Sequence, residues 1–165
     1  MNNFFKSLFF AACLMPEAHA AVPHTLKVLS FNILAPPWAS PSCYPPSAAP
    51  FLPREIRRAR ILAFLKSMKD STDIFCLQEV TPVEYGYIKE ALAGYVGIQV
   101  DHDPGYWLHY ITEDPPWEPN GNAILVRNDV FQDVLFSSVP LSKDGNCSAY
   151  MEAVHRSSGK KIRVL

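Results

Sequence analysis

The sequence predicts an α/β fold with mixed sheets, and two observations lead to this prediction. A strand-helix-strand pattern occupies the first half of the chain, with apolar strands at 26–34 and 74–80 and a helix at 54–69 between them. Short segments separated by Gly, Pro, Asn and Asp follow from residue 95 onward and are typical of strands and turns. Strands joined through a helix form a β-α-β unit, so we expect the first two strands to be parallel, with a right-handed crossover.

The composition is that of a folded domain. Of the 165 residues, 48% are hydrophobic and 19% are charged, which argues against disorder and allows one domain with a core. The formal net charge of -1 gives no support to a protein that holds nucleic acid mainly by neutralising its phosphates. A local basic cleft remains compatible with this sum.

Residues 1–20 are interpreted as a signal peptide. Lys6 lies in a short region without acidic residues, an apolar stretch follows at 8–15, and Ala18-His19-Ala20 supplies the small residues that precede a cleavage site. An apolar N-terminal helix or a retained anchor is the alternative. The stretch is too short to span a bilayer, and no later segment is long and apolar enough. We therefore expect an exported protein, extracellular or periplasmic, with its domain at 21–165.

Export affects the interpretation of the three remaining cysteines, Cys43, Cys76 and Cys147. Cys76 falls in an apolar strand and is expected to be a small core residue. Cys43 and Cys147 fall in loop-like contexts and are candidates for a disulfide in an oxidising compartment. No cysteine or histidine spacing indicates a zinc site.

The first strand, at 26–34, is dense in apolar residues and is predicted to be an inner strand, buried on both faces. The segment 35–53 holds seven of the fifteen prolines and is predicted to be a loop. The helix at 54–69 follows Pro53, which suits a helix start. Its apolar face is expected to comprise Ile56, Ile61, Leu62, Leu65 and Met68.

After the second strand, a second helix is predicted at 82–93, and Gly94 is expected to end it. A hairpin around Ser157-Ser158-Gly159 would join the last two strands. The final strand reaches the last residue, so we interpret the chain as the truncated front portion of a domain. The strands expected after the second helix are 95–100, 106–112, 122–127, 130–140, 149–155 and 161–165.

Two polar residues interrupt apolar strands near their ends, Asn32 in the first strand and Glu79 in the second. In parallel β-α-β architecture, ligands bind outside the carboxyl ends of the strands, so both side chains would meet at one crevice. A carboxylate and an amide oxygen suit Mg²⁺ or Mn²⁺. The alternatives are a solvated or ion-paired glutamate and an asparagine that belongs to a turn.

The succession of Leu26 to Leu34, a helix containing Arg57, and Asp73 to Val80 resembles the opening of the endonuclease/exonuclease/phosphatase superfamily, which includes DNase I-like nucleases. In that family an Asn ends the first strand, as Asn32 does here, and a metal-binding Glu follows Leu-Gln, as Glu79 does. The segments 120–126 and 161–165 resemble later family strands. The family's remaining motifs, which contain further His, Asp and Asn residues and end in an Asp-His pair that activates water, have no match in this sequence.

The resemblance implies the first half of a two-sheet β-sandwich flanked by helices. It also implies a hydrolase of phosphodiester or phosphomonoester bonds that uses Mg²⁺ or Mn²⁺, with Glu79 and Asn32 as metal-site and catalytic residues. A nuclease is the first choice. The alternatives are a sphingomyelinase-like or phospholipase-like esterase, an inositol phosphatase-like enzyme, and an inactive remnant. The partner would be a phosphate ester in nucleic acid, phospholipid or inositol phosphate, and no protein partner is implied.

Two further groups of residues have alternative interpretations. The first helix carries a basic cluster, Arg54, Arg57, Arg58 and Arg60. This cluster, and Arg57 in particular, would contact phosphate or form a solvated face. The aromatic stretch from Tyr106 to Trp117 would stack on bases, touch a membrane surface, or pack at the rim of the sandwich.

Overall fold

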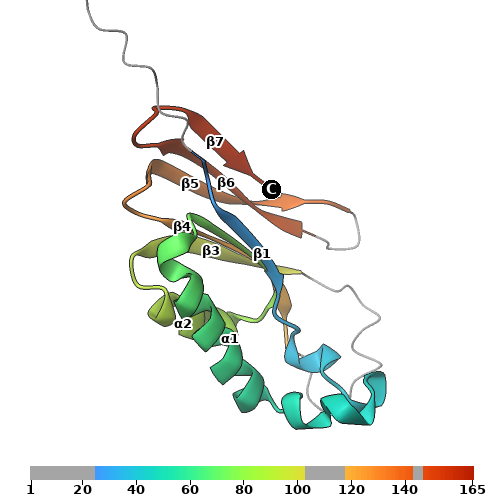
Figure 1. The fold of residues 1–165 in the computed structure, drawn as a ribbon. Helices are drawn as coiled ribbons and strands as arrows, with labels where there is room; N and C mark the ends of the chain where they lie inside the picture. The colour runs from blue at the N-terminus through green and yellow to red at the C-terminus, as the bar shows by residue number, and fades with distance from the viewer. Residues whose placement is uncertain (1–24, 103–117, 143–146) are drawn as a thin grey trace, which may run out of the picture.

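The computed structural model describes residues 25–102, 118–142 and 147–165. These residues form two β-sheets and two α-helices (Figure 1), which confirms the predicted α/β fold with two sheets. The elements in chain order are β1 (Val28–Asn32), η1 (Pro36–Trp38), η2 (Pro41–Cys43), η3 (Pro46–Phe51), α1 (Arg54–Met68), η4 (Lys69–Ser71), β2 (Ile74–Val80), α2 (Pro82–Ala91), β3 (Tyr95–His102), β4 (Asn120–Arg127), β5 (Phe131–Pro140), β6 (Cys147–His155) and β7 (Lys161–Val164).

The first sheet has the strand order β1-β2-β4-β3. Its β1 and β2 are parallel, as predicted, and their register runs from Val28 opposite Ile74 to Asn32 opposite Gln78. The other pairs of this sheet are antiparallel. The second sheet has the order β5-β6-β7, and its antiparallel β6 and β7 form the predicted hairpin.

The two sheets and the helices form three layers. Helices α1 and α2 cover one face of the first sheet, and the second sheet lies over its other face (Figure 1). Alternate side chains of β2 and β4 pack into two different cores, since successive residues point to opposite faces. In β2, Phe75 and Leu77 pack toward the helices, whereas Ile74 and Cys76 pack toward the second sheet. The helix-side core also holds Leu65, Ile88, Leu92 and Leu125, and the inter-sheet core holds Val126, Phe131 and Met151.

The prediction that the first strand is buried on both faces is wrong. Within the described sheet β1 lies at the edge, and its residues alternate between exposed and partly buried. Leu29 and Phe31 pack on the helix side, but Val28, on the opposite face, is 56% exposed. The reason is that β6 packs over β3 and β4, so the second sheet leaves that face of β1 uncovered.

Other boundaries differ by a few residues from the predictions. Residues 35–53 contain three short 3-10 helices, each beginning with proline, where a plain loop was expected. Ile56 was assigned to the apolar face of the first helix but is exposed. Strand β4 begins at Asn120, earlier than the predicted 122. The strand predicted at 106–112 lies outside the described residues.

Among the described residues, no helix has the length and apolar character needed to cross a membrane.

Gly97 of β3 is expected to tolerate no side chain. It pairs with Leu125, and a Cβ at this position would collide with the carbonyl oxygen of Ile124 and lie 2.8 Å from the Cγ of Leu125. We expect Gly97→Ala to lower the free energy of unfolding by about 2 kcal/mol, as overpacking does. Urea unfolding followed by circular dichroism measures this.

The matched control is Gly86→Ala in α2, where an added Cβ meets no atom within 4 Å. Because glycine is a poor helix former, this variant should be stabilised by about 0.5–1 kcal/mol. Equal effects of the two substitutions would contradict the packing described for β3 and β4.

Candidate active site

Glu79 reaches its position through a β-bulge near the end of β2. Gln78 pairs with Asn122 and Val80 pairs with Gly121, so Glu79 is the extra residue between them. Strict alternation after Phe75 and Leu77 would place Glu79 in the helix-side core. The bulge instead puts Val80 in that core, fully buried, and turns Glu79 away from it.

The backbone of Glu79 has a φ of 57°. This left-handed conformation is unfavourable for a residue with a side chain and costs on the order of 1–2 kcal/mol. Neighbouring contacts that hold it in place must therefore offset the cost.

Both carboxylate oxygens of Glu79 accept hydrogen bonds from the end of β1 and the turn that follows it. The amide nitrogen of Asn32 donates to Oε1 at 2.8 Å, and the backbone N–H of Ala35 donates to Oε2 at 3.0 Å. The Oδ1 of Asn32 in turn accepts from the backbone N–H of Leu34 at 2.8 Å. A carboxylate offers about four lone-pair positions, so two stay available after these bonds. The structure thus brings the two predicted site residues together and fixes the orientation of Glu79.

Glu79 and Asn32 line a cleft of about 550 Å³. The cleft lies between the ends of β1 and β2, the start of β4, the two residues that follow β5, and the start of β6. Its other lining residues are Gln78, Asn120, Gly121, Asn122, Leu141, Ser142 and Cys147. Amide side chains dominate this lining, and Glu79 is its one carboxylate among the described residues.

The donor set fits a hard divalent cation in part. Glu79 supplies a carboxylate with unused lone pairs, and Mg²⁺ is commonly held by one or two carboxylates together with water. Within the described residues, no three His, Cys, Asp or Glu side chains gather as a metal site. The amide of Asn32 is engaged with Glu79 and Leu34, so its geometry is that of a residue orienting the ligand. Its assignment as a direct metal ligand stays a prediction.

Arg57 does not line the cleft. It lies half-buried on α1, and its Nη1 donates to the carbonyl oxygen of Leu34 at 2.8 Å. Its Nε is buried without a hydrogen-bond partner among the described residues. Contact with a phosphate stays a prediction for Arg57, and the structure gives its guanidinium a backbone partner.

The rest of the basic cluster is mainly engaged in ion pairs and ring contacts. Arg54 and Arg58 both contact Glu84 of α2 at 2.8 Å, and Arg54 also contacts Glu118. Arg60 stacks over the ring of Phe51, 4.4 Å from its centroid. Arg54 and Arg58 therefore do not form the solvated face that was the alternative expectation, because both pair with Glu84 and are only partly exposed.

Glu84 is buried, and its position combines two contacts. Its backbone N–H donates to Thr81 Oγ1 at the start of α2, and its carboxylate takes the bonds from α1. Burial by itself raises the pKa of Glu84, but the hydrogen bonds from Arg58 and Arg54 outweigh burial and hold the pKa below its ordinary value of 4.5.

The predicted disulfide between Cys43 and Cys147 is not formed. Cys43 is exposed in η2, whereas Cys147 begins β6 at the cleft and donates from its sulfur to the carbonyl of Asp101 at 2.7 Å. The two thiols therefore lie on separate elements and are not bonded to each other. Cys76 lies partly buried in the inter-sheet core, as predicted, and burial raises its pKa.

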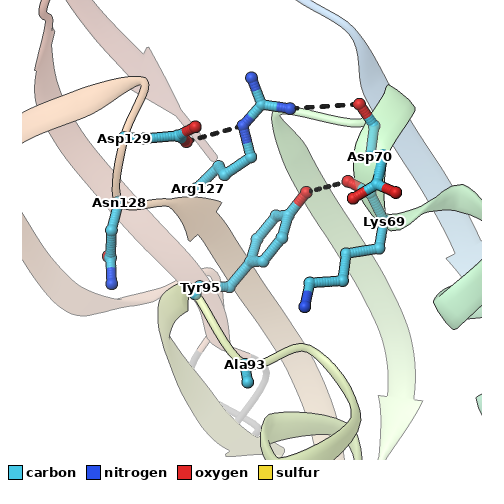
Figure 2. A pocket seen from close by; sticks show the side chains of 8 residues that line it. Lys69, Asp70, Ala93, Tyr95, Arg127, Asn128 and Asp129 are labelled. Carbon is cyan, nitrogen blue, oxygen red and sulfur yellow. Dashed lines mark hydrogen bonds and ion pairs between the residues drawn. The ribbon is translucent and has the colours of Figure 1, made fainter.

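A second cavity, of about 370 Å³, lies at the opposite end of the first sheet (Figure 2). Tyr95 donates from its hydroxyl to the carbonyl oxygens of Lys69 and Thr72. Arg127 contacts Asp73 and Asp129 at 3.2 and 2.8 Å. These hydrogen bonds and ion pairs hold the turn after α1 against the end of β4 and the start of β3. The polar groups described here are bonded to one another, so we assign them a structural role.

Sequence reasoning missed several residues of the cleft. Asn122 was assigned to a strand on the sequence pattern and Asn120 on the family resemblance, without a role in the site, yet both line the cleft beside Glu79. The backbone N–H of Ala35 was also missed, because a backbone donor leaves no signal in residue type. The Asn-Gly-Asn spacing in an otherwise apolar strand was the available signal for Asn122. The aromatic stretch from Tyr106 to Trp117 and the segment 1–20 lie outside the described residues.

The comparison with family models decides the affiliation of the chain. Residues 29–149 match the model of the endonuclease/exonuclease/phosphatase family. The chain belongs to this family. A search of curated proteins finds no match.

Solved structures share the fold of this family member. The human Nocturnin catalytic domain matches with a TM-score of 0.63 and 22% identity, over 84% of this chain and 47% of that one. A mannosyl-6-phosphatase of Bacteroides thetaiotaomicron matches with 0.56 and 21%, over 84% and 49%. A family member from Bacteroides vulgatus matches with 0.54 and 18%, over 84% and 50%. The chain thus spans about half the length of these structures.

The ion-paired Glu84 is expected to stabilise the helix pair. Glu84→Gln removes the carboxylate that Arg54 and Arg58 share, and leaves Arg54 paired with Glu118 only. We expect a loss of about 2 kcal/mol in the free energy of unfolding at neutral pH, below the cost for a fully buried pair because both arginines are partly exposed. Urea unfolding measures this loss. Glu90→Gln, at an exposed position of the same helix, should change it by less than about 0.5 kcal/mol.

The pH dependence follows from the lowered pKa of Glu84. The stability that the ionised Glu84 contributes is fully present above the pKa that this group has in the unfolded chain. It is lost as the pH falls through the lower pKa of Glu84 in the folded protein. The difference in stability between the native protein and Glu84→Gln should therefore shrink on acidification below about pH 4. A difference that stays constant down to pH 2 would contradict this account.

Proposed function

We propose that this chain carries the metal-binding part of a divalent-metal-dependent phosphoesterase, with Glu79 as a ligand of Mg²⁺ or Mn²⁺. The observation that supports this most directly is the bulge at Glu79. It removes one carboxylate from the helix-side core, fixes its orientation through Asn32 and Ala35, and presents it to a cleft of about 550 Å³. Family membership supports the same proposal.

A metal ion bound at Glu79 would polarise a phosphate oxygen and stabilise charge that develops there. The residues of this chain would do the positioning. Asn32 and the N–H of Ala35 hold the carboxylate, and the amides of Asn120 and Asn122 offer donors and acceptors to the polar part of a substrate. No general base is assigned among the described residues.

The sequence favoured nucleic acid as the substrate. The described lining of the cleft favours a second candidate, a small phosphate ester of a polar alcohol such as a sugar phosphate. Nucleic acid binding depends on several cationic contacts to phosphates. Among the described lining residues there is no Lys or Arg, and Arg54 and Arg58 are engaged with Glu84. Neutral amides suit hydroxyl groups. The mannosyl-6-phosphatase is a structural neighbour with such a substrate in its name.

A panel of substrates separates these candidates. The full-length protein with Mg²⁺ or Mn²⁺ would be assayed on sugar phosphates, DNA, RNA, sphingomyelin and inositol phosphates. We expect kcat/KM to be highest for a sugar phosphate. A higher value for DNA or RNA would return the proposal to a nuclease, and a higher value for sphingomyelin would favour a lipid esterase.

Export through residues 1–20 is also proposed. The apolar segment and the Ala18-His19-Ala20 pattern support it. N-terminal sequencing of the mature protein should find Ala21 as the first residue, and a retained Met1 would contradict cleavage.

Glu79→Gln is the central test of the proposed activity. The substitution keeps the shape of the side chain but removes the charge that would hold the cation. We expect metal-dependent hydrolysis of the best substrate of this panel by the full-length protein to fall by about 100-fold or more, since 100-fold is the upper end of the range for loss of an outer-shell partner. Glu55→Gln, at an exposed position in the first turn of α1, serves as the control. Undiminished activity of Glu79→Gln would remove Glu79 from the metal site.

A further inference from the structure

The turn after β1 holds Glu79 in place, and Leu34 is its central residue. The N–H of Leu34 donates to Asn32, whose amide reaches Glu79 Oε1, and the next N–H, of Ala35, donates to Glu79 Oε2. Both contacts to the carboxylate therefore depend on the path of the chain through Leu34. A rotation of the peptide units at this residue would misdirect both donors.

Leu34 has a φ of 58°, in the left-handed region. Leucine enters this region at a cost, because its Cβ crowds the backbone. The turn thus needs a contact from outside to hold it. Ile33 and Ala35 are buried on either side of Leu34, and Ile33 donates from its N–H to the carbonyl of Gln78. The carbonyl of Leu34 needs a donor of its own.

Arg57 supplies that donor from α1, with Nη1 at 2.8 Å from the Leu34 oxygen. The guanidinium lies half-buried, and burial lowers its pKa, while the nearby carboxylates of Glu84 and Glu79 act in the opposite direction. A charged group is withdrawn from water only at a cost, so its burial at this point indicates a specific role for the contact. Arg57 is also not among the described residues that line the cleft.

We propose that Arg57 is a positioning residue: by holding the carbonyl of Leu34 it sets the turn from Asn32 to Ala35 and thereby orients the Glu79 carboxylate for metal binding. The proposal rests on the proposed role of Glu79. It replaces the direct phosphate contact considered for Arg57 on sequence grounds with an action through the backbone. The helix then contributes to the metal site without contacting the metal ion or the substrate.

The test measures the affinity of the full-length protein for Mn²⁺ by electron paramagnetic resonance, in the absence of substrate. Arg57→Met keeps the aliphatic bulk but removes the donor, and we expect its affinity to fall by about tenfold, the lower end of the range for outer-shell partners. Arg57→Lys retains a charged donor and should restore part of the loss. Arg60→Met on the same helix, where the native side chain stacks on Phe51, should bind as the native protein does.

Two controls separate positioning from general loss of stability. Gly97→Ala is expected to destabilise the fold at a distance from the turn, and its Mn²⁺ affinity should be unchanged once the fraction of folded protein is taken into account. If Arg57→Met is not folded, Arg57→Leu, which also lacks the donor, carries the test, with the same expected loss of about tenfold. Native affinity in a folded variant that lacks the donor would overturn the proposal.

The outcomes also distinguish this inference from the proposed function. Glu79→Gln should lose most of its Mn²⁺ affinity, and if it does not, Glu79 is no ligand and the proposed function fails first. If Glu79→Gln loses affinity but Arg57→Met does not, only the role of Arg57 is wrong. A raised KM for substrate with native Mn²⁺ affinity in Arg57→Met would instead show a direct contact with phosphate.

Discussion

The hydrogen bonds between the Glu79 carboxylate and the turn after β1 connect the main parts of the described structure. They join the ends of two parallel strands, and those strands can lie side by side only because α1 carries the chain back to the start of β2. Arg57 of α1 donates to the carbonyl of Leu34 in the same turn. Through this turn, the carboxylate of Glu79 is linked to the first sheet and to the crossover helix, and it lines the cleft. Its orientation depends on the sheet and the helix.

The site combines local strain with extensive support. Glu79 and Leu34 both have left-handed backbone conformations, which non-glycine residues rarely adopt. The ladder on either side of the bulge, the buried Val80 and the donors from Asn32, Ala35 and Arg57 together hold them. Strained positions persist where the surrounding structure over-determines them, and they cluster at functional sites. The backbone therefore supports the interpretation of this cleft as the active site independently of residue type.

The charges of the described structure are used mainly for architecture. Glu84 ties α1 to α2 through two arginines, and Arg127 fastens the far end of the first sheet through Asp73 and Asp129. The described lining of the cleft, by contrast, consists largely of neutral amide side chains around Glu79.

The sequence by itself determined the β-α-β unit, the parallel pairing of β1 and β2, the hairpin of β6 and β7, and the meeting of Asn32 with Glu79. These follow from apolar periodicity and from the rule that parallel strands end at the same edge of a sheet. Only the tertiary structure decided that β1 lies at the edge of the described sheet, that Glu79 sits in a bulge, and that Arg57 donates to the backbone of Leu34. Strand order, a one-residue shift in a ladder and a backbone acceptor depend on contacts between distant segments, and residue type does not encode any one of them locally.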